Sequence, residues 1–172
     1  TSYVTGISQS LGGSGDPSPV TAFGVYIGMK ASVKHKLNKN SLKGLRISVQ
    51  GLGHVGTHLI DYLSKESVEL YVSDIDKSRV EYILNKYHCK YVKPDDILSQ
   101  DVDIYAPCAL GATVNSKTIN TLNCNIIAGA ANNVLNNPLK DSQLLQKKDI
   151  LYAPDYVINA GGLINVANEL EG

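Results

Sequence analysis

Three glycines near the middle of the chain have the spacing of a phosphate-binding turn. Gly51, Gly53 and Gly56 fit the pattern G-x-G-x-x-G, between a short β-type run and a helix-like segment. In this context Gly51 permits a tight turn, Gly53 allows a pyrophosphate to approach the backbone, and Gly56 lets the helix pack closely. The helix N-terminus at His54 and Val55 then offers N–H groups to the phosphates. The sequence therefore predicts a dinucleotide site.

Asp74 is placed to choose between NAD and NADP. It stands at the end of the next strand candidate, near the expected spacing of roughly 20 residues after Gly51. A carboxylate there accepts hydrogen bonds from the adenosine ribose and repels a 2′-phosphate, and Ile75 brings no positive charge to offset that repulsion. We therefore predict NAD as the cofactor, with a flavin or a glycine turn without ligand as the alternatives.

Two other sets of residues could do chemistry but are less favoured. His54 and His58 have the i, i+4 spacing of a metal-binding pair, yet no third ligand of suitable type follows on that face, so no metal site is expected. The simpler interpretation makes His54 a variable turn position and His58 a surface residue. Cys108 could be a nucleophile, but no histidine is near it in sequence, which favours an ordinary strand-end residue.

These residues are positioned by helices and strands that alternate along the chain. After a turn-rich loop at 12–20, a helix is expected to end near Asn38, with apolar residues at helical spacing: Val20, Phe23, Ile27 and Ala31. Strands are expected at 46–50, 69–74, 90–93, 102–106, 126–130 and 150–153. Helices are expected after the glycine turn (Val55, Leu59 and Leu63 on one face) and at 77–88, 94–99, 139–148 and 159–171. This order predicts an α/β fold of Rossmann type, a doubly wound, mainly parallel sheet with helices on both faces.

The composition suits one cofactor-binding domain. The chain has 172 residues, 43% hydrophobic and 19% charged, and its 16 basic residues balance 16 acidic ones. Nucleic acid and membranes are therefore not expected as partners. The three cysteines form no C-x-x-C pair, which fits a reducing, cytoplasmic compartment.

Six segments in order resemble the NAD-binding domain of the leucine, valine and phenylalanine dehydrogenases. They are GGSGDPSPVTAFGVY (12–26), VQGLGHVG (49–56), SDID (73–76), APCALGA (106–112), IAGAANN (127–133) and YAPDYVINAGGLINVA (152–167). The resemblance implies an oxidoreductase in which NAD takes a hydride from Cα of an L-amino acid. The resulting imine is hydrolysed to a 2-oxo acid and ammonium.

The resemblance also implies roles for single residues. Thr21 corresponds to a threonine that hydrogen-bonds the nicotinamide carboxamide, although a hydroxyl near a helix start is also compatible with a cap. The backbone at Cys108 and Ala109 would pass the cofactor at the carboxyl end of a strand. Asn132 and Asn133 would lie near the nicotinamide ribose and the substrate.

The implied substrate pocket is apolar. Thr5, Leu163 and Val166 fall where the family lines its side-chain pocket, and the last two share a helix face. Ordinary helix packing explains that face nearly as well. A branched-chain or other apolar amino acid is the expected substrate, in a leucine dehydrogenase-like enzyme. A glutamate dehydrogenase relative is disfavoured because neither helix residue is cationic.

The family's catalytic lysines have no counterpart among these motifs. They belong to an N-terminal domain, and we expect both it and a C-terminal helical extension to be absent from this chain, which opens on Thr1 and has Met29 as its single methionine. Residues 1–172 are accordingly expected to form an NAD-binding domain that is inactive alone and belongs to a homo-oligomeric enzyme. The alternative is a stand-alone NAD-binding regulatory module.

Overall fold

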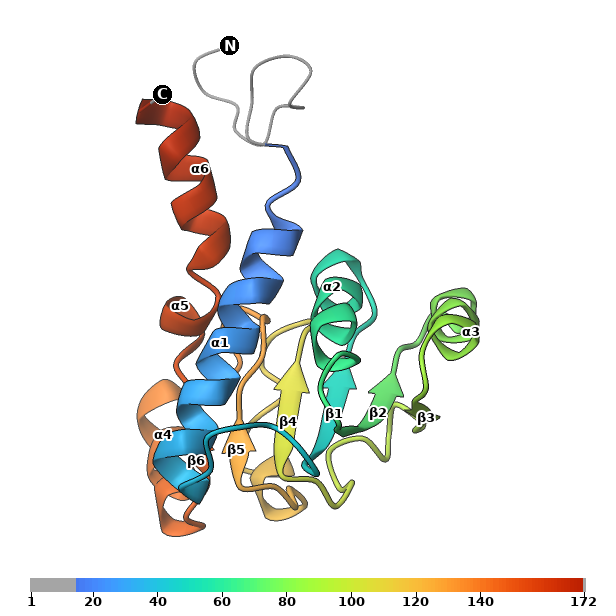
Figure 1. Cartoon of the computed structure of the whole chain (residues 1–172). Helices are drawn as coiled ribbons and strands as arrows, with labels where there is room; N and C mark the ends of the chain where they lie inside the picture. Colours follow the sequence, from blue (N-terminus) through green and yellow to red (C-terminus); the bar gives the residue numbers. More distant parts are fainter. Residues whose placement is uncertain (1–14, 172) are drawn as a thin grey trace.

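Six short strands form one parallel sheet at the centre of the computed structural model, which describes the backbone of residues 15–171 and the side chains of residues 15–167. The strands are β1 (Arg46–Gln50), β2 (Glu69–Ser73), β3 (Lys90–Tyr91), β4 (Ile104–Pro107), β5 (Ile126–Ile127) and β6 (Leu151–Tyr152). Their order across the sheet is β3-β2-β1-β4-β5-β6, and every pairing is parallel (Figure 1). The predicted α/β, doubly wound class is confirmed.

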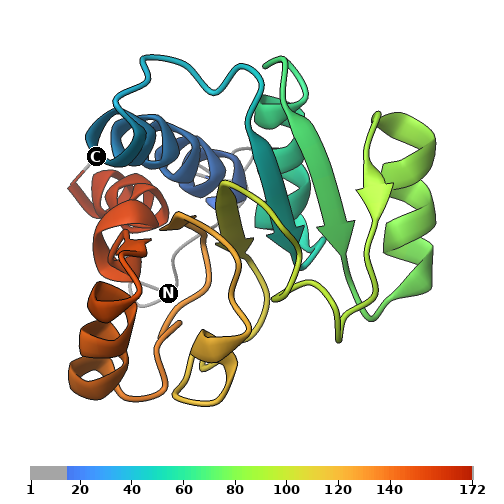
Figure 2. The same ribbon diagram turned by 90° about the horizontal axis from the view of Figure 1, so that it is seen from below.

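Helices cover both faces of this sheet. They are α1 (Ser18–Leu37), α2 (His54–Leu63), α3 (Lys77–Lys86), the 3₁₀ turn η2 (Thr118–Asn120), α4 (Pro138–Lys147), α5 (Asp155–Ile158) and α6 (Gly161–Glu171). Residues of α1, α2 and α3 join one apolar cluster, and residues of η2 and α4 join the other (Figure 2). Consecutive strand residues alternate between the clusters, as the pleat requires: Ile104 faces the first and Tyr105 the second. None of the described helices combines the length and apolar character needed to cross a membrane.

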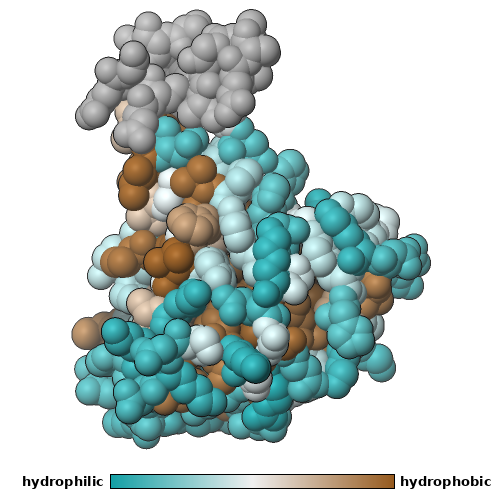
Figure 3. Space-filling view, in the orientation of Figure 1, coloured by the Kyte–Doolittle hydropathy of each residue, from teal (hydrophilic) through white to brown (hydrophobic). Residues whose placement is uncertain are grey.

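The long helix α1 uses a different apolar stripe from the one noted in the sequence. Its buried residues are Ser18, Ala22, Val25, Met29 and Val33, which pack toward α2 and the sheet. The other stripe is exposed, including Val20, Phe23 and Ile27. Apolar side chains therefore gather on the surface over α1 and α6 (Figure 3).

Some expected elements differ from the observed ones in type or in length. The helix expected at 94–99 is wrong, because isolated turns occupy this stretch, closed by i→i−3 bonds such as Ser99 N to Asp96 O at 3.1 Å. The helix expected at 159–171 is confirmed as α6, which begins at Gly161, and the short helix α5 that precedes it was not predicted. The outer strands are shorter than expected, with two paired residues each in β3, β5 and β6.

The register of the central strands aligns their carboxyl ends. Gln50 of β1 pairs with Ser73 of β2 on one side and with Pro107 of β4 on the other. The loops that follow these strands therefore begin at one edge of the sheet. In parallel α/β sheets this edge is where ligands bind, at the point where the strand order reverses.

The buried stripe of α1 can be tested with one pair of variants. We expect Met29→Ala to lower the free energy of unfolding by about 2–5 kcal/mol, because it removes a fully buried side chain between α1 and the sheet. Ile27→Ala, on the exposed stripe two positions away, should cost about 1 kcal/mol or less. Urea unfolding of both variants measures the difference, and equal losses would contradict the assigned orientation of α1.

Candidate functional site

Two glycines of the turn after β1 are required by packing. Gly51 has φ +100°, and a Cβ there would lie 2.7 Å from the backbone nitrogen of Ala109. A Cβ on Gly56 would lie 2.0 Å from the carbonyl oxygen of Gly51. No side chain fits at either position, so the turn is held tightly between the start of α2 and the loop after β4.

Gly53 differs, because the protein itself leaves room for a side chain there. Its φ of −70° is ordinary, and within 4 Å an added Cβ would meet a single atom, Nη1 of Arg79 at 3.7 Å. Gly53 is also the N-cap of α2, and no side chain caps that helix. The first N–H groups of α2, at His54 and Val55, therefore have no side-chain cap and lie next to this open position. A bare backbone beside uncapped amides is what a pyrophosphate site requires, so these residues could hold one.

The carboxylate of Asp74 fastens the glycine turn to the end of β2. Its Oδ2 accepts a hydrogen bond from the Leu52 amide at 2.6 Å, and its Oδ1 accepts one from the Asp76 amide at 2.8 Å. An ionised carboxylate has further acceptor positions on both oxygens, so ribose hydroxyls can still bind there. The predicted acid thus lies beside the predicted glycine turn.

A groove of about 450 Å³ joins these parts at the carboxyl edge of β1, β2 and β4. The predicted residues that it brings together are Gly51, Gly53, Asp74, Ile75, Cys108 and Ala109. Ile75 and Leu110 also line it and are 88% and 85% exposed. Exposed aliphatic side chains at such a groove suit the flat faces of an aromatic base. Leu110 was not identified from the sequence, although it follows Ala109 directly.

Cys108 lies in this groove as a structural residue. Its backbone N–H donates to the carbonyl oxygen of Gln50 at 2.7 Å, which continues the pairing of β4 with β1. Burial raises the pKa of the Cys108 thiol to about 11, so at neutral pH the thiol stays protonated. A protonated thiol is a poor nucleophile, which supports the strand-end interpretation.

The two asparagines after β5 lie in a turn against the loop after β4. Asn133 adopts a left-handed conformation with φ 51°, and its carbonyl oxygen accepts a hydrogen bond from the Ala112 amide at 2.7 Å. The side-chain oxygen of Asn132 accepts one from Nδ2 of Asn159 at 2.7 Å. Asn159 also donates to the Ala130 carbonyl at 3.2 Å, and so orients the Asn132 amide. No local signal in the sequence points to this role, because Asn159 lies 27 residues beyond Asn132 along the chain.

Thr21 lies where α1 and α6 cross. Its hydroxyl donates to the Pro17 carbonyl at 3.0 Å, and the N-cap of α1 is Pro17, so the alternative role of Thr21 as a cap is wrong. A Cβ on Gly162 would lie 2.4 Å from Thr21 Oγ1, and one on Gly161 would lie 2.5 Å from the Val20 carbonyl oxygen. The glycine pair therefore allows α6 to approach this hydroxyl closely.

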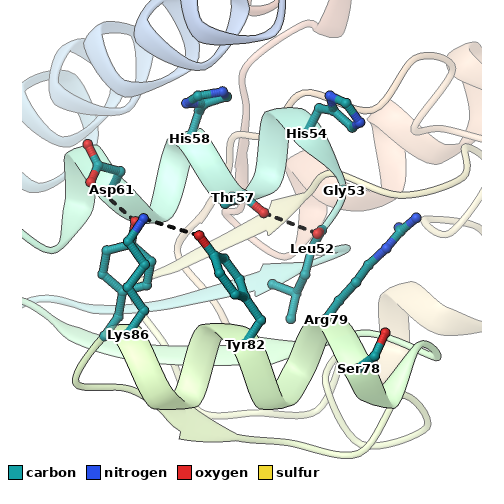
Figure 4. Close-up of a pocket in the computed structure, with 11 residues that line it drawn as sticks. Leu52, Gly53, His54, Thr57, His58, Asp61, Ser78, Arg79, Tyr82 and Lys86 are labelled. Atoms are coloured by element: carbon teal, nitrogen blue, oxygen red, sulfur yellow. Dashed lines mark hydrogen bonds between the residues drawn. The ribbon is translucent and has the colours of Figure 1, made fainter.

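The two histidines of α2 stand at the rim of a second groove, of about 740 Å³, between α2 and α3 (Figure 4). His54 is 82% exposed, and its Nδ1 lies 3.3 Å from Oδ2 of Asp16, next to the start of α1. Hydrogen bonds from Ser18, and then His54, hold the pKa of Asp16 below its usual value. Among the described side chains, residues 15–167, no three metal-ligating groups come together.

Of the three predicted substrate-pocket residues, the structure describes the two that lie on α6. Leu163 on α6 is 73% exposed and Val166 is partly buried, so this part of α6 presents apolar surface. Thr5 lies outside the described residues.

A six-stranded parallel sheet with a glycine turn and an acidic residue at its switch point defines a Rossmann-type class of domain. The sequence model of the Glutamate/Leucine/Phenylalanine/Valine dehydrogenase family matches residues 71–171. The chain belongs to this family, as the resemblance of its motifs predicted.

Named relatives cover the whole chain. A leucine dehydrogenase of Bacillus subtilis (strain 168) is 54% identical over all 172 residues, which span 47% of that protein. An L-tryptophan dehydrogenase of Nostoc punctiforme is 51% identical over the same length, which spans 48% of it. The chain thus spans about half the length of the curated relatives it matches.

Solved structures agree with the fold. The crystal structure of L-tryptophan dehydrogenase from Nostoc punctiforme superposes with a TM-score of 0.89 at 51% identity, over 91% of this chain and 47% of that one. A hetero-hexameric glutamate dehydrogenase from Thermus thermophilus gives a TM-score of 0.77 at 23% identity, over 98% of this chain and 43% of that one. At that identity the second likeness concerns the fold alone.

The different demands on the two glycines predict different stabilities. We expect Gly56→Ala to lower the free energy of unfolding by about 2–3 kcal/mol, because its Cβ would overlap the Gly51 carbonyl. Gly53→Ala should change it by about 1 kcal/mol or less, since its backbone conformation suits alanine although glycine is the better N-cap. Thermal unfolding measures both, and a loss for Gly53→Ala as large as that for Gly56→Ala would show that packing, not a ligand, requires this glycine.

Proposed function

We propose that this chain is the NAD-binding domain of an NAD-dependent L-amino-acid dehydrogenase. The reaction is oxidative deamination of an apolar, leucine-like amino acid to a 2-oxo acid and ammonium. The observation that carries the proposal is the open space at Gly53, beside uncapped amides of α2 and the carboxylate of Asp74. The 54% identity to a leucine dehydrogenase along the whole chain supports the choice of substrate class.

The groove suggests how the dinucleotide lies. Ile75 and Leu110 would flank the adenine ring, and Asp74 would accept hydrogen bonds from the ribose hydroxyls. The diphosphate would lie against Gly53 and the first turn of α2. The nicotinamide half would then extend toward the loop after β5, with Asn132 and Asn133.

The chain's own residues bind and orient the reactants. The bound nicotinamide supplies the chemistry, as acceptor of a hydride from Cα of the substrate. Thr21, whose hydroxyl is fixed by the Pro17 carbonyl, is positioned at the α1–α6 crossing to bind the carboxamide. The exposed Leu163 would contact the substrate side chain, with Val166 behind it. These contacts contribute by orientation, which is a large part of catalysis in such reactions.

The acid–base groups of the reaction are assigned to another domain. We call the groove of about 450 Å³ at the carboxyl edge of β1, β2 and β4 the cofactor groove. Among the described residues no lysine lines it, and burial keeps its one thiol, that of Cys108, protonated. The complete enzyme would be a cytoplasmic homo-oligomer that carries the lysines expected from the family. A stand-alone NAD-binding regulatory module is the alternative, and it would likewise bind NAD without turnover; the coding sequence upstream of Thr1 would distinguish the two.

Cofactor binding and turnover give the first test. Isothermal titration of the 172-residue chain with NAD should give a dissociation constant in the micromolar range or weaker. Gly53→Ala should weaken binding about tenfold or more, equivalent to about 1.4 kcal/mol, because its methyl group occupies the pyrophosphate position. NADH formation from L-leucine should not be measurable. Absence of NAD binding would refute the proposed function, and robust turnover would refute the assignment of the catalytic groups to another domain.

Cofactor preference gives a second test. Asp74→Ser combined with Ile75→Arg should move the ratio of dissociation constants toward NADP, since a repelling carboxylate is replaced and a cation is added. The double variant should also be less stable, because serine cannot accept hydrogen bonds from both the Leu52 and Asp76 amides as the carboxylate does. The Ile75→Arg single variant separates the two effects. An unchanged preference in the double variant would count against Asp74 as the discriminating residue.

A further inference from the structure

Arg79 occupies a defined position on the first turn of α3. Asp76 caps this helix, with Oδ1 accepting hydrogen bonds from the Ser78 amide at 2.9 Å and the Arg79 amide at 3.4 Å. The other oxygen, Oδ2, lies 3.3 Å from Nε of Arg79. One carboxylate therefore both starts the helix and holds the inner nitrogen of the guanidinium group.

With Nε paired to Asp76, one outer nitrogen of Arg79 lies beside the glycine turn. Nη1 lies 3.7 Å from the place that a Cβ of Gly53 would occupy, closer than any other atom that such a Cβ would meet. Figure 4 shows the side chain extending from α3 toward the start of α2, near Gly53 and His54. Among the side chains that the structure describes, residues 15–167, the Arg79 guanidinium forms an ion pair with Asp76 through Nε, and the side chain is 53% exposed. Nη1 of Arg79 thus lies next to the open position at Gly53.

The charged residues that line the cofactor groove favour an anionic ligand group near Arg79. Of the described residues that line the cofactor groove, Arg79 is the only one with a positively charged side chain. It also lines the groove between α2 and α3, so it stands on the ridge between the two. The opposing charge in the cofactor groove is that of Asp74, whose oxygens already bind two backbone amides.

We propose that Arg79 is a cofactor-binding residue whose Nη groups donate hydrogen bonds to the diphosphate of the dinucleotide, with Asp76 as its positioning residue. The inference rests on the proposed function, because it requires the groove to hold an adenine dinucleotide. A planar guanidinium group with its Nε already fixed can bind phosphate oxygens with little further loss of side-chain freedom.

The diphosphate fits the position of Arg79 better than other parts of the cofactor do. A 2′-phosphate would lie on the ribose, beside the carboxylates of Asp74 and Asp76, where like charges repel it. The adenine ring would lie between Ile75 and Leu110. Nη1 is placed instead at Gly53, the glycine with no packing reason to lack a side chain.

Titration of the 172-residue chain with adenosine, AMP, ADP, NAD and NADP tests this assignment. In Arg79→Ala we expect the dissociation constants of ADP and NAD to rise about 5- to 20-fold at low salt, as for loss of a partly exposed charged hydrogen bond, and that of adenosine to stay unchanged. Arg79→Lys should keep part of the affinity. Lys77→Ala, which removes a cation from the same exposed turn outside both grooves, should change each constant less than twofold.

Each contrary result has a separate meaning. If the unaltered chain binds neither ADP nor NAD, the proposed function fails and the inference fails with it. If the unaltered chain binds NAD and Arg79→Ala binds it equally well, the inference alone is overturned. Equal losses for adenosine and ADP would place the guanidinium on the nucleoside, and a loss confined to NADP would place it on the 2′-phosphate. Both results overturn the diphosphate contact. Thermal unfolding of each variant confirms that it is folded.

Discussion

The arrangement of the whole site depends on how tightly the glycine turn is held. Gly51 and Gly56 are each in contact with backbone atoms at distances that exclude a side chain, and Asp74 binds the Leu52 amide from the neighbouring strand. A hydrogen bond to a charged group contributes about 1.5–3 kcal/mol, and here it joins two loops that begin on different strands. Because the turn cannot shift, the amides of α2 point in a fixed direction before any ligand arrives. Such preorganisation is what a phosphate site requires.

The parts of the site that the sequence predicts well are those with local causes. A glycine turn between a strand and a helix is determined by neighbouring residues, and so is the acid at the end of the next strand. The orientation of α1 could not be predicted in this way. That helix carries apolar residues on more than one side, and periodicity alone does not say which stripe meets the sheet. The helix prediction for 94–99 is wrong because the residues of these isolated turns resemble the start of a helix in composition.

Residues missed in the sequence act across long distances along the chain. Asn159 orients Asn132 from beyond β6, and the parallel sheet alone brings them to the same edge. Arg79 is a surface helical residue by pattern, and the Asp76 cap that fixes it to the first turn of α3 is seen only in the structure. What the sequence does not contain is the distance between that turn and Gly53. This distance follows from the spacing of β1 and β2, which places α2 and α3 side by side.

The parallel sheet also determines how the binding edge can come into being. In the described sheet no two neighbouring strands are joined by a hairpin, so each pairing closes a long loop. Proteins dominated by such nonlocal contacts fold slowly. The edge draws residues from loops after β1, β2, β4, β5 and β6, so an incompletely folded chain has little of the binding surface. A ligand of this edge would consequently recognise the native state alone, and its presence would shift the folding equilibrium by mass action. If that ligand is a dinucleotide, its concentration would then set the fraction of newly made chains that is folded.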